Sequence, residues 1–364
     1  MVEWKKLGEA CQIKTGKLNA NEQVENGLYP FFTCDATPYR IDNYAFDTEA
    51  ILISGNGSQV GHLNYYKGKF NAYQRTYVLD KFKGIDVFYL YHFLKKVVRP
   101  YVMEKSKKGS VPYITLPMLT SLEIPTPSLS EQQRIVGILD TFTSSIENLK
   151  EQIAQRRKQY EYYRDQLLDL EGKEGVEIAP LRRIVKSYYT GATPNKGHLE
   201  YYESGTIPWL RTQDVKFNEI FEIDSFVTEE AVAKTGVKWI PANCVIVAIS
   251  GATAGRCAIN KIPTTTNQHC LNLEINPNKA LYKYVYYCVY NAYSDMISKK
   301  QGARGDLNSS IILGITIPVP SLSEQQRIVS ILDTFEASIN NLEQQLAQRE
   351  KQYEYYRNKL LTFE

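Results

Sequence analysis

The chain contains one long segment twice, and this duplication limits its possible folds more than any other feature. Residues 124–171 read IPTPSLSEQQRIVGILDTFTSSIENLKEQIAQRRKQYEYYRDQLLDLE, and residues 317–364 read IPVPSLSEQQRIVSILDTFEASINNLEQQLAQREKQYEYYRNKLLTFE. About 35 of the 48 positions are identical, at an offset of about 193 residues, which is far longer than the period of a solenoid repeat. The repeated unit is therefore a whole domain followed by this segment.

Each copy is predicted to form one long helix. A serine, Ser130 or Ser323, comes just before acidic and amide side chains, a pattern typical of a helix start. Apolar residues then alternate at spacings of four and three, which is a heptad seam. At about 1.5 Å per residue, a helix of about 40 residues would be about 60 Å long. The seam includes Leu139, Phe142, Ile146 and Leu149 in the first copy and Leu332, Phe335, Ile339 and Leu342 in the second.

The two helices are expected to pair with each other, because an apolar stripe of this length cannot remain in water. We favour an antiparallel two-helix coiled coil. Each helix directly follows its own globular domain, so antiparallel pairing relates the two domains by an approximate two-fold axis. Arg156 and Arg349 interrupt the seam at matching positions, which would help to fix the register.

The globular segments predict an α+β fold, with two mixed α/β domains separated by the coiled coil. Short apolar runs indicate strands, and two tyrosine-rich stretches, residues 86–104 and 281–297, indicate helices. The predicted strands are residues 29–32, 50–54, 75–79, 244–249 and 271–275.

The predicted boundaries follow the repeat. Gly172 and Gly175 mark a flexible joint before the second domain. The expected order is a first domain over residues 1–123, a first helix over 124–171, a linker over 172–179, a second domain over 180–316 and a second helix over 317–364.

The two globular segments share faint landmarks, so we expect them to have one fold. Residues 51–55 resemble 247–251, and residues 72–74 fall on 266–268. Gly57 and Gly61 match Gly251 and Gly255, and Ile114-Thr115 matches Leu307-Asn308.

Charge placement points to nucleic acid, although the net charge of +3 is mild. Basic residues surround a glycine at equivalent places in both domains, and such loops suit a phosphate backbone. Glutamine, asparagine, threonine and arginine side chains can hydrogen-bond to base edges. The predicted DNA-binding residues are Gln74, Arg75, Lys105, Lys107, Lys108, Thr115, Arg211, Gln268, Lys299, Lys300, Arg304 and Asn308.

The sequence predicts neither a metal site nor an active site. Its six cysteines form no CxxC pair, so we interpret them as reduced thiols in the core or on the surface. Residues 55–61 imitate a dinucleotide-binding loop, but their last glycine is one place late and the following residues indicate a strand. No P-loop, no GxSxG and no amino-methyltransferase motif is present.

No apolar run reaches the length of about 20 residues that a membrane span needs, and the N-terminus lacks an apolar signal core. A soluble protein of the prokaryotic cytoplasm is expected.

The doubled motif Pro-x-Pro-Ser-Leu-Ser-Glu-Gln-Gln-Arg-Ile-Val with its long helix closely resembles the specificity subunit of type I restriction-modification systems. Residues 191–194 (GATP) followed by 207–210 (IPWL) also resemble the start of that family's target recognition domain. The first domain departs from this pattern, because residues 28–32 read LYPFF.

The resemblance implies a non-catalytic subunit that reads a bipartite, asymmetric site on double-stranded DNA. It implies two methyltransferase subunits docked on the helices, and restriction or motor subunits in complexes that cut DNA. The chain itself would bind no cofactor, since S-adenosylmethionine, Mg²⁺ and ATP would belong to the partner subunits.

The helix copies also agree at outward positions, including Asp140 and Arg164, which a coiled coil alone does not constrain. Two identical partners on a two-fold scaffold would explain this agreement. The predicted partner-binding residues are Gln132, Gln133, Arg134, Gln325, Gln326 and Arg327. The alternative is a non-enzymatic coiled-coil scaffold that binds proteins and whose basic loops are merely solvated.

Overall fold

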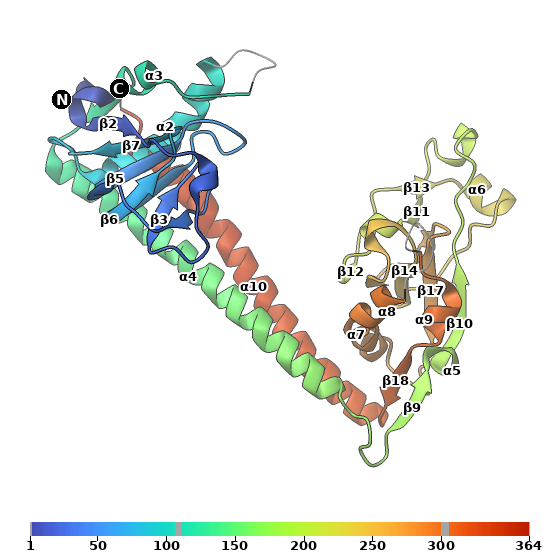
Figure 1. Cartoon of the computed structure of the whole chain (residues 1–364). Coiled ribbons are helices and arrows are strands. Elements are labelled where there is room, and N and C mark those ends of the chain that lie inside the picture. Colours follow the sequence, from blue (N-terminus) through green and yellow to red (C-terminus); the bar gives the residue numbers. More distant parts are fainter. Residues whose placement is uncertain (1, 106–110, 300–305, 364) are drawn as a thin grey trace. The chain divides into compact units, whose positions relative to one another are not determined.

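A computed structural model describes residues 2–105, 111–299 and 306–363 (Figure 1). The chain divides into two compact units, the first of which combines two separate stretches of the sequence. The first unit comprises Met1–Glu151 with Glu343–Glu364, and the second comprises Gln152–Leu342. Each unit therefore contains one mixed α/β domain, part of the helix that follows it and part of the other helix.

The first domain is built on a six-stranded sheet with the strand order β2-β7-β5-β6-β3-β4. Apolar residues of α2, such as Leu90 and Leu94, are fully buried with Ile51 and Ile53 of β5 in one core cluster. The elements are β1 (Glu3–Lys6), α1 (Leu7–Ala10), β2 (Gln12–Thr15), η1 (Ala20–Glu22), β3 (Tyr29–Phe32), β4 (Tyr39–Ile41), β5 (Phe46–Ser54), β6 (Leu63–Ala72), β7 (Thr76–Asp80), α2 (Val87–Lys105), α3 (Leu116–Thr120) and β8 (Glu123–Thr126).

The second domain has a five-stranded sheet, β10-β17-β14-β15-β12, and a three-stranded sheet, β13-β11-β16. Its elements are β9 (Glu177–Pro180), α5 (Leu181–Ile184), β10 (Val185–Thr190), η2 (Leu199–Tyr201), β11 (Ile207–Leu210), η3 (Thr212–Asp214), β12 (Asn218–Ile220), β13 (Phe226–Val227), α6 (Glu229–Lys234), β14 (Val245–Ala248), η4 (Gly251–Thr253), β15 (Cys257–Asn260), β16 (Thr265–Thr266), β17 (Cys270–Ile275), α7 (Tyr282–Asn291), α8 (Tyr293–Ser298), α9 (Ser309–Leu313) and β18 (Thr316–Val319).

The two domains share the order of their central strands, which agrees with the expectation of one common fold. The order β2-β7-β5-β6 corresponds to β10-β17-β14-β15, and all these neighbours are antiparallel. Ser54 pairs with Thr76 in the first domain, and Ala248 pairs with Cys270 in the second. Residues 51–54 therefore correspond to 245–248, and the predicted match to 247–250 was two residues out of register.

The glycine match was correct. Gly57 and Gly61 have φ angles of 80° and 78°, and Gly251 and Gly255 have 74° and 88°. The amides of Gly61 and Gly255 donate to the carbonyls of Ser54 and Ala248, both over 2.8 Å. Both turns need the left-handed conformation that glycine adopts without a steric penalty.

The first domain departs less from the GATP and IPWL pattern than its sequence suggests. Phe32 pairs with Ala72 in parallel, as Leu210 pairs with Thr266, so residues 29–32 correspond to 207–210. A Cβ on Gly16 would lie 1.8 Å from the carbonyl oxygen of Ala72, and one on Gly191 would lie 2.0 Å from that of Thr266. Gly16 is therefore the equivalent of Gly191.

A pair of strands joins the two ends of the domain in each unit, and the sequence predicted neither pair. β1 pairs with β8, and β9 pairs with β18, all antiparallel. β9 begins at Glu177, inside the segment 172–179 that we expected to be a linker. These strands connect the start of each domain to the residues just before its long helix.

The long helices are α4 (Leu129–Leu168) and α10 (Leu322–Leu360), and their packing is antiparallel (Figure 1). In the first unit the ring of Phe142 stacks on Tyr356 at 5.2 Å, and Lys150 pairs with Glu350. In the second unit Phe335 stacks on Tyr163 at 5.4 Å. Phe142 and Phe335 are matching residues of the two copies, as are Tyr356 and Tyr163, so the same contact occurs once in each unit.

The seam residues are protected from solvent as predicted. Leu139 and Leu332 are fully buried, Ile146 and Leu149 are each 9% exposed, and the other predicted seam residues are partly buried. Arg156 and Arg349 lie over the rings of Phe335 and Phe142, respectively, at 5.9 and 5.7 Å. The arginines thus cover seam aromatic rings by cation–π contact.

We predict that Gly191→Ala destabilises the second domain by about 1–3 kcal/mol or more, because the new methyl group would overlap backbone. Gly137→Ala is the matched control: Gly137 lies on α4 with open space around its Cβ position, and alanine should stabilise the helix by about 0.5–1 kcal/mol. Urea denaturation measures both changes. Equal unfolding free energies for Gly191→Ala and the parent would contradict the close approach.

Candidate nucleic-acid interface

The first domain gathers four loops at one end of its sheet. The amide of Gly55 donates to the carbonyl of Arg75 over 2.9 Å, and the amide of Ile114 donates to the carbonyl of Gly55 over 2.7 Å. The Gln74 amide donates to the carbonyl of Leu18 over 2.9 Å. We call the loops 16–19, 55–61, 73–75 and 113–115 the first loop cluster.

The second domain repeats this arrangement. The amide of Ile249 donates to the carbonyl of His269 over 2.9 Å, and the amide of Leu307 donates to the carbonyl of Ile249 over 2.8 Å. The amide of Asn267 donates to the carbonyl of Leu210 over 3.0 Å, which adds the loop after β11. The second loop cluster comprises residues 191–194, 210–214, 249–255, 266–269 and 306–308.

The loop clusters contain about half of the predicted DNA-binding residues. Gln74, Arg75 and Thr115 belong to the first cluster, and Arg211, Gln268 and Asn308 belong to the second. Gln74 and Gln268 are both exposed. They occupy equivalent positions, because Gln74 lies two residues before β7, which pairs with β5, and Gln268 lies two residues before β17, which pairs with β14.

The remaining predicted residues are placed differently. Lys105 ends α2, with its ammonium over the Tyr101 ring at 5.8 Å. Lys299 follows α8 and pairs with Asp295 over 2.6 Å. Lys107, Lys108, Lys300 and Arg304 lie outside the described residues.

Neighbouring side chains hold the two equivalent glutamines. The Gln74 amide group donates to Asn19 Oδ1 over 3.1 Å, whereas Gln268 Oε1 accepts a hydrogen bond from the Thr193 hydroxyl. Asn308 caps α9, with its Oδ1 accepting from the amide of Ile311 over 2.9 Å. Such fixed side chains present defined donors and acceptors, which recognition of base edges requires.

Three polar residues of the clusters were missed by the sequence reasoning. Asn19 and Thr193 were missed because they follow Gly16 and Gly191, whose equivalence only the structure reveals. His269 is exposed and corresponds to Arg75. The correct match of residues 72–74 with 266–268 could have identified His269, since both residues come directly after the glutamine.

Gln132 and Gln325 were predicted to bind a partner, and the structure corrects this. Both are fully buried. Gln132 Oε1 accepts from the amide of Asp86 over 2.7 Å, and Gln325 Oε1 accepts from the amide of Leu281 over 2.9 Å. Each amide side chain thus connects the start of a long helix to the start of its domain's tyrosine-rich helix.

Two further contacts attach each domain to its helix in the same way. Tyr89 and Tyr284 donate their hydroxyls to the carbonyls of Pro125 and Pro318, over 3.0 and 2.9 Å. One turn further along, His92 Nε2 lies at hydrogen-bond distance, 2.9 Å, from Asp140 Oδ1. The Tyr287 hydroxyl donates to Asp333 Oδ1 over 2.6 Å at the matching place in the second domain. The helix residues are identical in the two copies, and at the last contact the domain residues differ.

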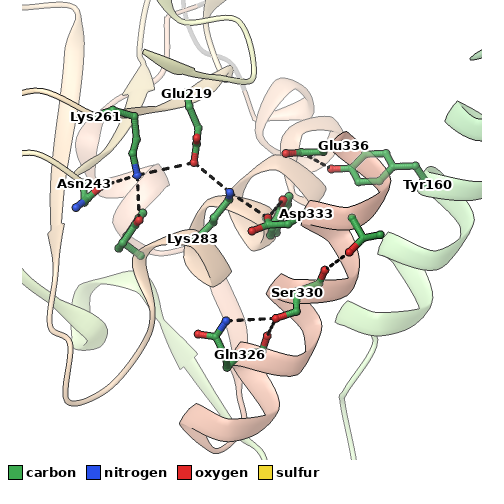
Figure 2. A network of polar contacts seen from close by, with 12 residues as sticks. Tyr160, Glu219, Asn243, Lys261, Lys283, Gln326, Ser330, Asp333 and Glu336 are labelled. Carbon is green, nitrogen blue, oxygen red and sulfur yellow. Dashed lines mark hydrogen bonds and ion pairs between the residues drawn. The ribbon is translucent and has the colours of Figure 1, made fainter. Parts of the chain in front are cut away.

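Asp333 belongs to a larger polar network in the second unit (Figure 2). The Lys283 ammonium lies 3.1 Å from Asp333 and 3.1 Å from Glu219 of β12, so it links the sheet edge to α10. Burial alone would lower the pKa of Lys283, but the hydrogen bonds that its ammonium donates to these carboxylates, together with their negative charge, outweigh burial and raise that pKa. Burial raises the pKa of the neighbouring Glu336, whose carboxylate accepts from the Tyr160 hydroxyl over 3.0 Å.

The identity of Gln132, Asp140 and Arg164 between the copies therefore has a cause inside the protein. Arg164 and Arg357 lie over the rings of Tyr160 and Tyr353, respectively, at 5.7 and 5.4 Å. An external partner is not needed to explain these three identities. Gln133, Arg134, Gln326 and Arg327 are exposed, and each arginine also pairs with a glutamate of its own helix over 2.7 Å.

Within the described part of the chain, no group of three or more histidine, cysteine, aspartate or glutamate side chains could hold a metal ion. The described helices also include none that is both long and apolar enough to cross a membrane.

Comparison with known proteins finds similarity over the whole chain. The family model of the type I restriction modification DNA specificity domain matches residues 1–156 and 173–350. The specificity subunit of the type I restriction enzyme EcoR124I/EcoR124II of Escherichia coli is 34% identical over 391 residues, covering 100% of this chain and 94% of that protein. A putative type I restriction enzyme specificity subunit of Haemophilus influenzae is 27% identical and covers 100% and 96%.

Solved structures share the fold. The crystal structure of a type I restriction-modification S subunit from M. genitalium has a TM-score of 0.68 at 18% sequence identity, covering 100% of this chain and 97% of that one. A structure from work on complex assembly and conformational transition of the type I R-M system has a TM-score of 0.62 at 14% identity, covering 99% and 96%.

We predict that the attachment of the first domain weakens in mild acid because of His92. Burial lowers its pKa, against the opposing effect of Asp140, and its ring fits the neutral form that donates to Asp140 and accepts from the Tyr353 hydroxyl. With a folded pKa below the unfolded value of about 6.5, the unfolded state binds the proton more readily. This contribution to stability is therefore fully present above about pH 6.5 and is lost as the pH falls towards the folded pKa.

The measurement is the free energy of unfolding from pH 8 to pH 5. His92→Gln should flatten the decline between pH 7 and pH 5, whereas His269→Gln, which changes an exposed histidine, should leave it as in the parent. An unchanged decline in His92→Gln would show that His92 is not its source.

Proposed function

Since this chain belongs to the family of type I restriction-modification DNA specificity subunits, we propose that its two domains each read one part of a bipartite, asymmetric site on double-stranded DNA. Members of this family are non-catalytic, so methylation and cleavage belong to partner subunits. S-adenosylmethionine, Mg²⁺ and ATP would be used there.

The observation that carries this proposal is a common backbone frame with different side chains. The two loop clusters share the hydrogen bonds of Gly55 and Ile249 and of Ile114 and Leu307. On this frame Gln74 is followed by Arg75, whereas Gln268 is followed by His269. Two equal frames with unequal side chains suit two half-sites of different sequence, because base edges are distinguished by the donors and acceptors that face them.

The exposed amide and basic side chains of the clusters fit direct readout of the DNA bases. A glutamine amide can pair with both N6 and N7 of adenine, and an arginine guanidinium can pair with O6 and N7 of guanine. The basic residues before each cluster, Lys105 and Lys299 among those described, suit contacts to phosphate, which orient the protein without reading sequence.

We predict that Gln74→Ala and Gln268→Ala each relax recognition of one half-site and leave the other unchanged. The loss of a bidentate base contact costs about 1–3 kcal/mol, which is about tenfold or more in discrimination at that position. The measurement is methylation by the assembled complex on a library in which each position of both half-sites varies. Gln344→Ala, on the exposed side of α10, is the matched control.

If both glutamine variants weakened binding equally whichever position of the DNA site was varied, their side chains would contact the DNA backbone or stabilise the loops, and would not read bases. If neither the parent chain nor its complex retained duplex DNA at low salt, the protein-binding scaffold would be the better explanation.

The long helices are proposed to bind two identical methyltransferase subunits. If the fully buried Leu139 and Leu332 define position a of the heptad, position c lies two residues after position a in each heptad. All position c residues are exposed in both copies and identical between them, namely Arg134, Thr141, Asn148, Gln155 and Tyr162 with Arg327, Thr334, Asn341, Gln348 and Tyr355. The neighbouring position g residues from Glu131 to Gln159 are also identical to those from Glu324 to Gln352.

Each compact unit contains one complete set of these position c residues. The first unit has Arg134, Thr141, Asn148, Gln348 and Tyr355, and the second has Arg327, Thr334, Asn341, Gln155 and Tyr162. The domains instead contact positions a, b and e, through residues such as Gln132, Asp140 and Glu336. Two identical exposed faces, one in each unit, are what two identical partners require.

We predict that Tyr162→Ala and Tyr355→Ala each weaken the binding of one methyltransferase subunit by about tenfold or more, since exposed tyrosines often dominate interfaces. The double variant should weaken both. Titration followed by native mass spectrometry counts the bound subunits, and Lys158→Ala, at an exposed position f of α4, is the control. Unchanged two-subunit binding by the double variant would exclude these tyrosines from the interface.

A further inference from the structure

We propose that charges at position e make the first helix copy pair with the second copy of its own chain and disfavour pairing between equal copies of two chains. This selection goes beyond the proposed function, and it decides whether the coiled coil closes within one molecule.

The seam itself does not distinguish the two copies. Phe142 packs on Tyr356 and under Arg349, and Phe335 packs on Tyr163 and under Arg156, which are the same residue types at matching positions. If two first copies paired across two chains, Phe142 would meet a tyrosine and an arginine just as it does now. Burial of the seam therefore favours equal and unequal pairs alike.

Position e does distinguish them. Three of its six residues differ between the copies: Thr143, Lys150 and Arg157 correspond to Glu336, Glu343 and Glu350. Lys150 and Arg157 are the only residues from Leu129 to Leu168 whose charge has the opposite sign in the second copy. Residues at positions e and g line the sides of a coiled coil, where their charges determine the choice of partner.

The structure contains the attractive pair that this pattern predicts. In the first unit Lys150 Nζ lies 3.3 Å from Glu350 Oε1, with both side chains about half exposed. Both residues lie beside Glu147, Lys351 and Glu354 in an open groove of the first unit that Lys95 of α2 also lines. Burial lowers the pKa of Lys95, and the positive charges of Arg357 and Lys150 lower it further.

Pairing between equal copies would remove this attraction. The residue of the first copy that corresponds to Glu350 is Arg157, so two paired first copies would place Lys150 of each chain against Arg157 of the other. Two paired second copies would place Glu343 against Glu350, again twice. Each exposed pair contributes little by itself, but the choice between partners depends on the difference between the attractive Lys150–Glu350 pair and the repulsive pairs that equal copies would form.

An exchange of charges that leaves the net charge unchanged tests the selection. The variant R157E/E350K swaps the charges of one heptad position between the copies. It places lysine against Lys150 within one chain, and it creates two opposite-charge pairs when two first copies or two second copies of different chains meet. The variant K150E/R157E/E343K/E350K exchanges both positions and restores opposite charges between unequal copies.

The full chains are compared by light scattering, and by retention of an untagged chain on a co-expressed tagged one, at low and at about 1 M salt, where screening within a few ångströms should reduce the effect. The expected result is a single-chain mass for the parent and for the fourfold variant. R157E/E350K should form species of two or more chains, retain the untagged chain several-fold better than the parent and lose this association at high salt.

The proposal is overturned if R157E/E350K keeps the single-chain mass and the melting temperature of the parent. It is also overturned if the fourfold variant associates or unfolds as R157E/E350K does, because the charges would then act through their local surroundings and not through the choice of partner. Neither result affects the proposed reading of DNA, which the library assay measures separately.

Discussion

The antiparallel packing of α4 against α10 is the interaction on which the rest of the structure depends. Neither unit closes with its own helix alone. The core of the first unit contains Tyr353 of α10 and Leu361, which directly follows α10, and the core of the second contains Tyr160 and Leu168 from the end of α4. Each domain therefore rests on the helix that follows it and on the helix that follows the other domain. Separating the helices would expose part of both cores.

The duplication has kept the attachments and changed the surfaces. Gln132 and Gln325 hold the same buried position, and both Tyr89 and Tyr284 donate to a proline carbonyl before the helix. A buried amide without partners would cost free energy, which keeps these residues identical for reasons internal to each unit. At the solvent-exposed ends of the sheets, no such cost limits the side chains, and Arg75 and His269 can differ on the same backbone.

The candidate site could be predicted only in part. Gln74 and Gln268 were identified because a short motif recurs, and the structure places them at equivalent positions. His269, Asn19 and Thr193 were missed, since a residue in an irregular loop gives no periodic signal. The two-residue error in matching the central strand has the same origin, because apolar β residues resemble one another at several registers, whereas Gly57 and Gly251 are fixed by their positive φ angles.

The sequence by itself determined the duplication, the two long helices, their seam and the mixed α/β character of both domains. These follow from periodicity, because burial of apolar area depends on residue type and spacing and hardly on the identity of the partner. Only the tertiary structure decided that Gln132 and Gln325 are buried, that each compact unit takes part of both helices, and that β1 and β9 pair with β8 and β18, the strands just before the long helices. A polar residue's role depends on atoms far away in the sequence that its hydrogen bonds reach, and no local pattern specifies them.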